Sequence, residues 1–311
     1  MGLNLSGMTT ETRNPRTMQL DQMSPLEIVT VMNEEDARVP LAIAKCLPQI
    51  AQAVTWAAES FEKGGRLFYM GAGTSGRLGV LDAAECPPTF GVPKEMVVGL
   101  IAGGEKAFIE AVEGAEDSRE LAVEDLKAHS LTADDFVVGI AASGRTPYVL
   151  GGLDYAKSVG CHTAAIACNI GSAIGKAAEL AIEVNCGPEV LTGSTRLKSG
   201  TAQKLILNMI STGSMVRTGK AYQNLMVDVQ QTNEKLHTRA ENIVIDATGV
   251  EREKARAAID AAGGSVKTAI TMLLADCDAK EAARRLERAH GHVREAIRLE
   301  VQIGRASCRE R

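Results

Sequence analysis

Short apolar segments that alternate with amphipathic ones constrain the fold of this chain more than any other feature of its sequence. Five strand-like segments follow one another along the middle of the chain: RLFYM (66–70), MVVGLIA (96–102), FVVGIAA (136–142), HTAAIA (162–167) and LAIEV (180–184). Segments of helical character lie between them, around 75–84, 117–128, 147–159 and 172–178. Buried strands without clean alternation, separated by helices, are typical of a parallel sheet covered on both faces. We therefore predict an α/β fold, an αβα sandwich around a five-stranded parallel sheet.

Helical segments flank the predicted sheet on both sides. Apolar residues recur at helical spacing from Pro25 to Phe61, and Gly64-Gly65 ends that region. The same spacing predicts one long helix over 197–219 and three short helices over 250–262, 265–274 and 279–289. We divide the chain into an N-terminal extension with helices (1–56), a sheet domain (57–220), a small C-terminal helical region (221–302) and a tail (303–311).

The two chain ends differ from the rest. The last residues, Ile303–Arg311, break the helical pattern and resemble the translation of a sequencing adapter, so we interpret them as a non-native tail. The first ~20 residues are polar, and we expect them to be extended because termini become ordered only when they are tied down.

Composition excludes several classes of function. Lys plus Arg number 34 against 39 Asp plus Glu, and aromatic residues make up only 3% of the 311 residues, which argues against a nucleic-acid binder. No run approaches the ~20 apolar residues of a membrane span, and the N-terminus has no apolar signal core. The seven cysteines form no C-x-x-C pair, as expected for a reducing compartment. We expect a cytoplasmic protein without a membrane or nucleic-acid partner.

A glycine-rich loop follows the first predicted strand. Residues 71–76 read GAGTSG, which matches the G-x-G-x-x-G of dinucleotide folds. That fold expects an acid ~20 residues on, whereas Glu105 comes later. Hydroxyls and free N–H groups at a helix N-terminus suit a terminal phosphate better. The alternative is an ordinary turn in which Ser75 caps the helix. The candidate phosphate-binding residues are Gly73, Thr74 and Ser75.

A second loop of the same kind follows the third predicted strand. Residues 142–147 read ASGRTP, and Pro147 suits the first turn of the next helix. Two hydroxyls and free N–H groups favour an anion site, although a plain capping turn remains the alternative. Both loops follow strand ends, where open α/β sheets bind ligands, and both contain Ser-Gly-Arg. The candidate binding residues are Ser143, Gly144, Arg145 and Thr146.

The sequence around the second loop resembles a known domain and a known family. A strand followed by S-G-x-T-P and a helix resembles the sugar isomerase (SIS) domain, a five-stranded parallel αβα module that binds phosphorylated sugars. Longer segments closely resemble the N-acetylmuramic acid 6-phosphate etherase family, at 71–91, 99–118, 137–149, 193–209 and 224–237.

This resemblance implies a specific reaction. Enzymes of that family cleave the D-lactyl ether of N-acetylmuramate 6-phosphate with water, giving N-acetylglucosamine 6-phosphate and D-lactate. The implied mechanism is elimination followed by hydration, in which a base removes the C2 proton, lactate leaves C3, and water adds. Such chemistry needs one carboxylate and one carboxylic acid, and it needs no metal or organic cofactor.

Two glutamates match the catalytic positions of the family pattern. We assign Glu85, in AECPP, as the acid for lactate departure and Glu116, in GAED, as the C2 base. The alternative for either residue is a solvated carboxylate at a helix end. A straight helix after the first loop would hold Glu85 roughly 15 Å from that loop. Either the helix ends early, the phosphate binds mainly at 143–146, or a second subunit shares the site. We favour the last two, with Pro87-Pro88 turning the chain.

Further polar residues have weaker claims to the site. Thr195 and Lys198 open the predicted long helix, where a cation could meet phosphate or lactate, although a solvated first turn is an equal alternative. His237, in a polar cluster that resembles a family motif, is a candidate for sugar-ring opening. SIS domains usually pair, so we expect a homodimer. Two other functions stay open: a non-catalytic sugar-phosphate sensor and an aldose–ketose phosphosugar isomerase.

Overall fold

The computed structural model describes residues 7–110, 112–229, 231 and 233–299. The predicted non-native tail lies outside the described residues. The chain forms two compact units: unit 1 contains the residues up to Pro87 together with Val92–Ser214, and unit 2 contains Pro88–Gly91 together with the residues from Met215 on. Among the described residues, no helix has the length and apolar character needed to cross a membrane.

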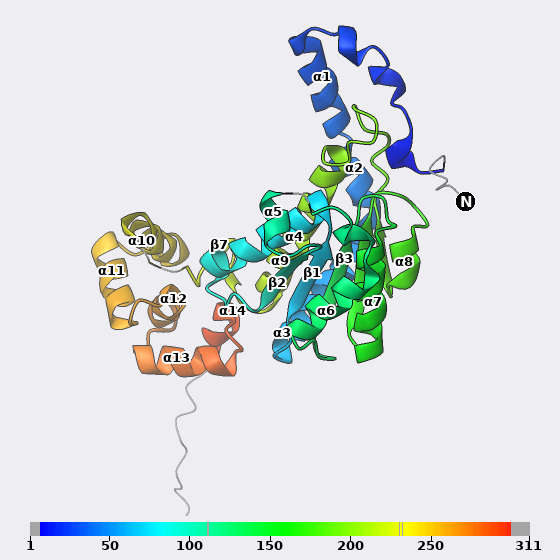
Figure 1. Cartoon of the computed structure of the whole chain (residues 1–311). Helices are drawn as coiled ribbons and strands as arrows, with labels where there is room; N and C mark the ends of the chain where they lie inside the picture. The colour runs from blue at the N-terminus through cyan, green and yellow to red at the C-terminus, as the bar shows by residue number, and fades with distance from the viewer. Residues whose placement is uncertain (1–6, 111, 230, 232, 300–311) are drawn as a thin grey trace, which may run out of the picture. The chain divides into compact units, whose positions relative to one another are not determined.

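Unit 1 is built on a five-stranded parallel sheet, as predicted (Figure 1). The strands stand in the order β2-β1-β3-β4-β5. Their bounds are β1 Leu67–Gly71, β2 Val97–Ile101, β3 Phe136–Ile140, β4 His162–Ala167 and β5 Leu180–Glu183. Every residue of β1 and β3 is buried, because helices cover both faces, and this explains the uninterrupted apolar runs.

Alternate residues of the strands face two different helical layers. Phe68 and Met70 belong to a core with α6 (Arg119–Ala128), α7 (Pro147–Val159) and α8 (Ala173–Ala177). On the other face, Tyr69 lies against Gly79 of α4 (Gly73–Phe90), and Val54 of α3 (Leu47–Glu62) lies against Gly213 of α9 (Lys198–Arg217). Two short elements follow β2, namely α5 (Lys106–Ile109) and 3-10 helix η5 (Ala115–Asp117).

The order in which successive strands join the sheet reverses between β1 and β3. After β1 the chain passes through α4 to β2 on one side, and β3 pairs with β1 on the other, with Gly71 opposite Ile140. The loop after β1 and the loop after β3 therefore leave neighbouring strands at the same edge of the sheet. This is the topological switch point at which open α/β sheets bind ligands.

The beginning of the described chain is more ordered than its composition predicted. Three 3-10 turns, η1 (Thr9–Glu11), η2 (Pro15–Thr17) and η3 (Leu20–Gln22), precede helix α1 (Pro25–Asp36). The expectation of an extended N-terminus is thus wrong for residues 8–23, which we call the N-terminal strap. Three of its polar residues, Thr10, Asn14 and Thr17, are buried. Thr17 Oγ1 donates to the Val190 carbonyl at 2.8 Å, and Asn14 Nδ2 donates to the Pro188 carbonyl at 3.2 Å. Then α2 (Val39–Ile43) and η4 (Ala44–Cys46) lead to α3.

Helix α4 is longer than predicted. It continues through Pro87 and Pro88 to Phe90, so the prediction that these prolines turn the chain is wrong. A proline keeps a helical φ and removes one N–H donor, and here the lost donors fall in the last turns of the helix. The boundary between the two units falls between the two prolines.

Unit 2 is the predicted small helical region. After a hairpin of β6 (Ala221–Tyr222) and β7 (Leu225–Met226), its helices are α10 (Glu234–Thr248), α11 (Arg252–Ala261), α12 (Val266–Ala275), α13 (Ala279–Arg288) and α14 (Val293–Ala296). Residues 259–270 (IDAAGGSVKTAI) and 286–297 (LERAHGHVREAI) are similar, and both have two consecutive positive φ angles in the turn, at Gly263-Gly264 and His290-Gly291. The unit is therefore built on a repeated helix–turn–helix that composition did not reveal.

Candidate active site

The loop after β1 closes directly into a helix. Helix α4 begins at Gly73, whose φ is 52°, so Ser75 lies inside the first turn and does not cap it. Ser75 is buried and its hydroxyl donates to Gln203 Oε1 of α9 at 3.0 Å. Thr74 lies beside Gly200 and, among the described residues, its hydroxyl has no hydrogen-bond partner. This loop therefore joins α4 to α9 and leaves one hydroxyl for a ligand.

In the loop after β3, every carbonyl oxygen is already bonded. The oxygens of residues 141–144 each accept at least one hydrogen bond from the protein, and Gly144 makes the tight turn possible with a φ of 73°. The donors are the N–H groups of Gly144, Cys168 and Ile174 and the side-chain amide of Asn169. With its carbonyls held by the protein, the loop presents donors to a ligand.

Two backbone donors of this second loop are free. The N–H groups of Ser143 and Thr146 have no hydrogen-bond partner within the described residues. Thr146 is the N-cap residue of α7, but its hydroxyl makes no capping bond. Ser143 Oγ accepts from the Arg145 N–H at 3.3 Å and can still donate. Two hydroxyls, two N–H groups, a helix N-terminus and the half-buried Arg145 together favour an anion.

The two candidate glutamates lie at different distances from this loop. Glu116 is exposed in η5, whose neighbouring Ala115 is buried in the same core cluster as Tyr148, in the first turn of α7. Helix α7, which follows the loop, packs against η5, so Glu116 lies on an element that contacts this helix. Glu85 is exposed on α4, ten residues beyond Ser75, which is roughly 15 Å along a helix axis. Glu116 therefore lies on an element in contact with the helix that follows this loop, whereas Glu85 lies well along α4 from the loop after β1.

Asp82, one turn before Glu85, is turned into the protein. Its Oδ1 accepts from the Ser211 hydroxyl at 3.1 Å, and among the described residues its buried Oδ2 has no partner. Burial raises the pKa of Asp82 and raises that of the Cys86 thiol to about 12. Glu85 is exposed while Asp82 faces the interior between α4 and α9, so only Glu85 can meet a ligand.

Lys198 is part of a buried ion pair. Its ammonium, almost fully buried, donates to Glu35 Oε2 at 2.6 Å, and Arg16 also donates to the Glu35 carboxylate. Burial would raise the pKa of Glu35, but these bonds outweigh it and hold the pKa below its ordinary value. The Lys198 N–H, with that of Ser199, donates to Glu189, which caps α9. The partner on α1 is far away in sequence, and the spacing of residues gave no signal for it.

Thr195 precedes α9, which begins at Lys198. Its carbonyl accepts from the Gly200 N–H at 3.0 Å, and its side chain is half-buried. Since Gly200 also lies beside Thr74, the start of α9 lies next to the loop after β1. Thr195 is thus adjacent to the switch point.

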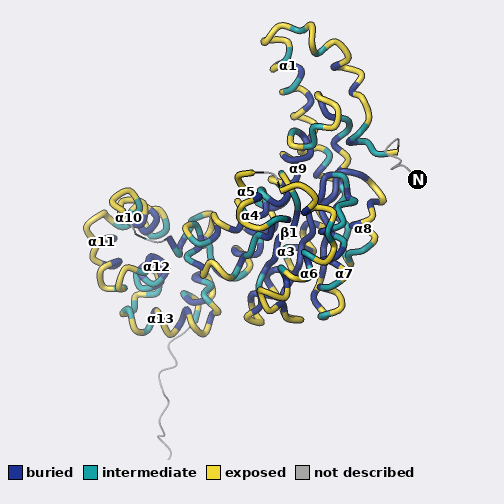
Figure 2. The backbone as a smooth tube through the Cα atoms, viewed as in Figure 1, coloured by how far each residue is buried: buried dark blue, intermediate teal, exposed yellow. Residues whose placement is uncertain are grey.

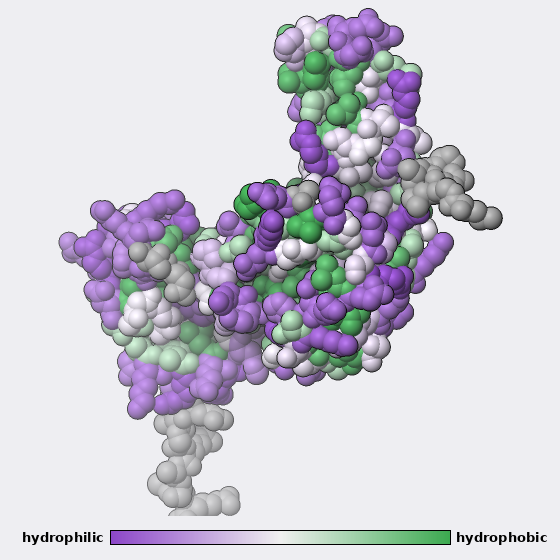
Figure 3. Space-filling view, viewed as in Figure 1, coloured by the Kyte–Doolittle hydropathy of each residue, from purple (hydrophilic) through white to green (hydrophobic). Residues whose placement is uncertain are grey.

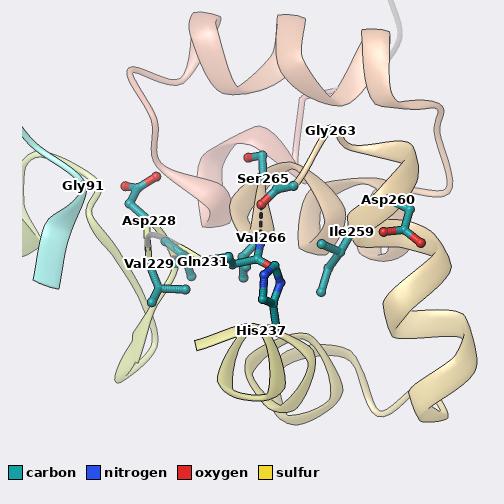
Figure 4. Close-up of a pocket in the computed structure, with 12 residues that line it drawn as sticks. Gly91, Asp228, Val229, Gln231, His237, Ile259, Asp260, Gly263, Ser265 and Val266 are labelled. Carbon is teal, nitrogen blue, oxygen red and sulfur yellow. Dashed lines mark hydrogen bonds between the residues drawn. The ribbon is translucent and has the colours of Figure 1, made fainter. Parts of the chain in front are cut away.

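His237 belongs to unit 2. It is exposed on α10, and its Nδ1 lies 3.0 Å from Gln231 Oε1 (Figure 4). Both residues line a pocket of about 440 Å³ within unit 2, together with Asp228, Asp260 and Ser265. Among the residues that the structure describes, no three or more His, Cys, Asp or Glu side chains are placed to hold a metal ion.

Comparison with known proteins agrees with the fold and extends over nearly the whole chain. Residues 49–157 match the model of the glucokinase regulatory protein N-terminal SIS domain, and residues 119–212 match the SIS domain. A solved protein of Bacteroides fragilis, provisionally described as a phosphosugar isomerase involved in capsule formation, is 21% identical with a TM-score of 0.50 and covers 65% of this chain and 95% of its own. At that identity the likeness concerns the fold alone.

Two relatives are far closer. The N-acetylmuramic acid 6-phosphate etherase of Exiguobacterium sp. (strain ATCC BAA-1283 / AT1b) is 63% identical over 293 residues, which cover 94% of this chain and 100% of the relative. The protein of the same name from Geobacillus sp. (strain WCH70) is 59% identical over 293 residues, covering 94% and 99%. On this full-length similarity, the chain belongs to the N-acetylmuramic acid 6-phosphate etherase family.

Proposed function

We propose that this protein hydrolyses the D-lactyl ether of N-acetylmuramate 6-phosphate to N-acetylglucosamine 6-phosphate and D-lactate, in the recycling of cell-wall sugars. The observation that carries the proposal is the 63% identity to a relative of that name along its full length. The anion-binding geometry of the loop after β3 agrees with a phosphorylated substrate.

The loop after β3 binds the phosphate in this proposal. The hydroxyls of Ser143 and Thr146 and their N–H groups donate to phosphate oxygens, and Arg145 contributes a positive charge. Gly144 carries no side chain, so its backbone can approach the ligand closely. Thr74, from the neighbouring loop, has a free hydroxyl within the described chain and donates to the same substrate. Ser75 and Gly73 shape that first loop.

The chemistry then needs two carboxyl groups. Glu116 removes the C2 proton of the open-chain aldehyde, and the electron pair of that C–H bond forms the C2–C3 double bond. The C3–O bond breaks, and Glu85 gives its proton to the departing lactate oxygen. Water adds to C3 of the unsaturated aldehyde, its proton passing to Glu85, while C2 regains a proton from Glu116. Both carboxyl groups return to their starting states.

A second copy of the chain completes the site in our proposal. Glu85 lies roughly 15 Å along α4 from the loop after β1, and we assign it to the substrate bound by a neighbouring subunit. Large apolar side chains are exposed on the N-terminal helices, with Leu26 at 74% and Leu41 at 71% (Figures 2 and 3). Such exposure is typical of an interface, and it supports a homodimer.

The remaining candidate residues take supporting roles. Thr195, beside the first loop, is placed to contact substrate, and Lys198 holds the start of α9 from inside the protein. His237 stays a candidate for sugar-ring opening. Six described cysteines are free, five of them buried, which supports a reducing, cytoplasmic location.

Hydrolysis in heavy-oxygen water tests the proposed reaction. The purified protein is incubated with N-acetylmuramate 6-phosphate in H₂¹⁸O, and both products are analysed by mass spectrometry. Elimination followed by hydration predicts the label at C3 of N-acetylglucosamine 6-phosphate and unlabelled lactate. Label in lactate would contradict this mechanism. A ketose product without lactate would indicate an isomerase, and tight binding without turnover would indicate a sensor.

A further inference from the structure

Asn169, directly after β4, uses its whole side-chain amide to hold two other segments. Its Oδ1 accepts from the Thr10 N–H at 3.4 Å, and its Nδ2 donates to Thr10 Oγ1 at 3.1 Å. The same Nδ2 donates to the carbonyls of Ala142 at 3.3 Å and Ser143 at 3.2 Å. Since Nδ2 has two hydrogens, one is shared between acceptors. Asn169 is 7% exposed, so solvent cannot replace these partners.

These bonds determine which way the loop after β3 presents its backbone. Asn169 holds the carbonyl oxygen of Ser143, and it shares the carbonyl oxygen of Ala142 with the Cys168 N–H, which donates at 2.9 Å. If either oxygen turned outward, it would repel an anion at the place where the N–H groups of Ser143 and Thr146 are free. The side-chain amide of Asn169 is already bonded to Thr10 and to the two carbonyls, so its role is to position the loop.

The N-terminal strap fixes Asn169 in turn. Thr10 is 1% exposed and bonds to both ends of the Asn169 amide, which sets the orientation of that amide. At the start of the strap, Met8 Sδ lies 3.8 Å from Arg145 Nη1. The strap is independently anchored by Asn14, which donates to Glu35 at 3.1 Å, and by Thr17.

We propose that Asn169 and Thr10 are positioning residues for sugar-phosphate binding, through which the N-terminal strap holds the loop after β3 in its anion-binding form. This inference rests on the proposed function for the identity of the anion, a phosphate ester. It assigns to a polar N-terminal segment a role in substrate affinity.

Two conservative variants at Thr10 test the inference, with a variant at Thr17 as control. Thr10→Val removes the hydroxyl that accepts from Asn169, whereas Thr10→Ser keeps it. Thr17→Val removes a strap hydrogen bond to Val190 without touching Asn169. The measurements are kcat and KM for N-acetylmuramate 6-phosphate, and the inhibition or dissociation constant for inorganic phosphate.

We expect T10V to weaken phosphate binding and raise KM by about 3- to 10-fold, the value of one hydrogen bond, with kcat changed less than about twofold. Asn169→Ala should weaken binding further, by about 10- to 100-fold, because the Ser143 carbonyl is released and Thr10 loses both of its bonds to the amide. T10S and Thr17→Val should bind like the wild type. If Asn169→Ala fails to fold, the comparison of T10V with T10S still tests the inference.

The inference is overturned if T10V and T10S bind phosphate equally, or if Thr17→Val weakens binding as much as T10V does, since strap stability alone would then explain the effect. Phosphate binding is measured without turnover. An inactive wild type would therefore reject the proposed reaction, while the Thr10 comparison would still decide the role of the strap.

Discussion

The loops on the two sides of the switch point contain the same short motif, but their hydroxyls have different hydrogen-bond partners. Ser-Gly-Arg follows β1 and follows β3, and each side also carries one candidate glutamate. On the β1 side, Ser75 is buried against Gln203 and Glu85 lies far along α4. On the β3 side, the hydroxyls of Ser143 and Thr146 can donate, their N–H groups are free within the described residues, and Glu116 lies on η5, which contacts α7. The comparison teaches that the partner of a hydroxyl, rather than the motif that contains it, determines whether it can bind a ligand.

The largest expected effect is the loss of lactate release when either candidate glutamate is replaced, and mixed dimers then distinguish the two residues. Glu85→Gln and Glu116→Gln should each reduce lactate release by about 10²- to 10⁴-fold without unfolding the protein. When Glu85→Gln is mixed with a Ser143→Ala/Thr146→Val variant and dimers re-form at random, half the dimers are mixed and each has one intact site. Activity should therefore return to about a quarter of the wild-type value.

The matched mixture should stay inactive. Glu116 lies on the same side of the same chain as the phosphate loop, so Glu116→Gln mixed with the Ser143→Ala/Thr146→Val variant leaves no complete site. Lactate release is measured for both mixtures after unfolding and refolding together. Equal recovery in both, or in neither, would contradict the assignment of the two glutamates to different subunits.

Two glycines provide the next comparison. Gly144 has a φ of 73°, and a Cβ there would lie 2.4 Å from Ser172 Cβ, whereas Gly73 has a φ of 52° and nothing within 4 Å of its Cβ position. Gly144→Ala should cost at least about 2 kcal/mol of unfolding free energy and most of the phosphate affinity. Gly73→Ala should cost only about 1 kcal/mol. Chemical denaturation and phosphate titration measure both, and equal losses of affinity would argue against the β3 loop as the main site.

Removal of a hydroxyl should mainly raise KM in the loop after β3 and mainly lower stability in the loop after β1. Thr146→Val should raise KM by about 10-fold or more, the value of a hydrogen bond to a charged group, with little loss of stability. Ser75→Ala should destabilise the fold by about 1–3 kcal/mol, because it leaves Gln203 Oε1 buried without its donor, and should change KM less. The comparison fails if Ser75→Ala raises KM more than Thr146→Val does.

The smallest expected effect is a pH dependence of the free energy of unfolding that arises from Asp82 on α4. Burial raises the pKa of Asp82 above its ordinary 3.8, so the folded state favours the protonated acid. The contribution of Asp82 to stability is fully present below the ordinary pKa and is lost as pH rises through the raised one. Asp82→Asn, which stays neutral at every pH, should therefore be more stable than the wild type near pH 7, and this gain should fall towards zero near pH 4. Urea unfolding of both proteins at pH 4 and pH 7 measures the difference in their free energies of unfolding. The prediction is refuted if Asp82→Asn exceeds the wild type by less at pH 7 than at pH 4.

Local patterns predicted the sheet and the edge at which it binds a ligand. The five strands are short, mostly apolar runs, which are typical of buried parallel strands. The two hydroxyl loops were found from turn residues placed directly after strands, and the paired positions of Gly71 and Ile140 bring them together.

Long-range polar contacts account for what the sequence did not predict. Thr10, Asn14 and Thr17 form a polar segment without helical or strand periodicity, and only their bonds to loops far along the chain order it. The same holds for Lys198, whose partner Glu35 is separated from it by 163 positions. The length of α4 was missed because a pair of prolines is a strong local stop signal, and helix packing overrides it here.

A crystal structure of the Glu116→Gln variant with bound N-acetylmuramate 6-phosphate tests the central claim most directly. We predict phosphate oxygens within about 3.2 Å of Ser143 Oγ and Thr146 Oγ1, with Glu85 of a second subunit approaching the lactyl ether. A phosphate bound elsewhere, at the unit 2 pocket beside His237 or against the first turn of α4 alone, would contradict the account.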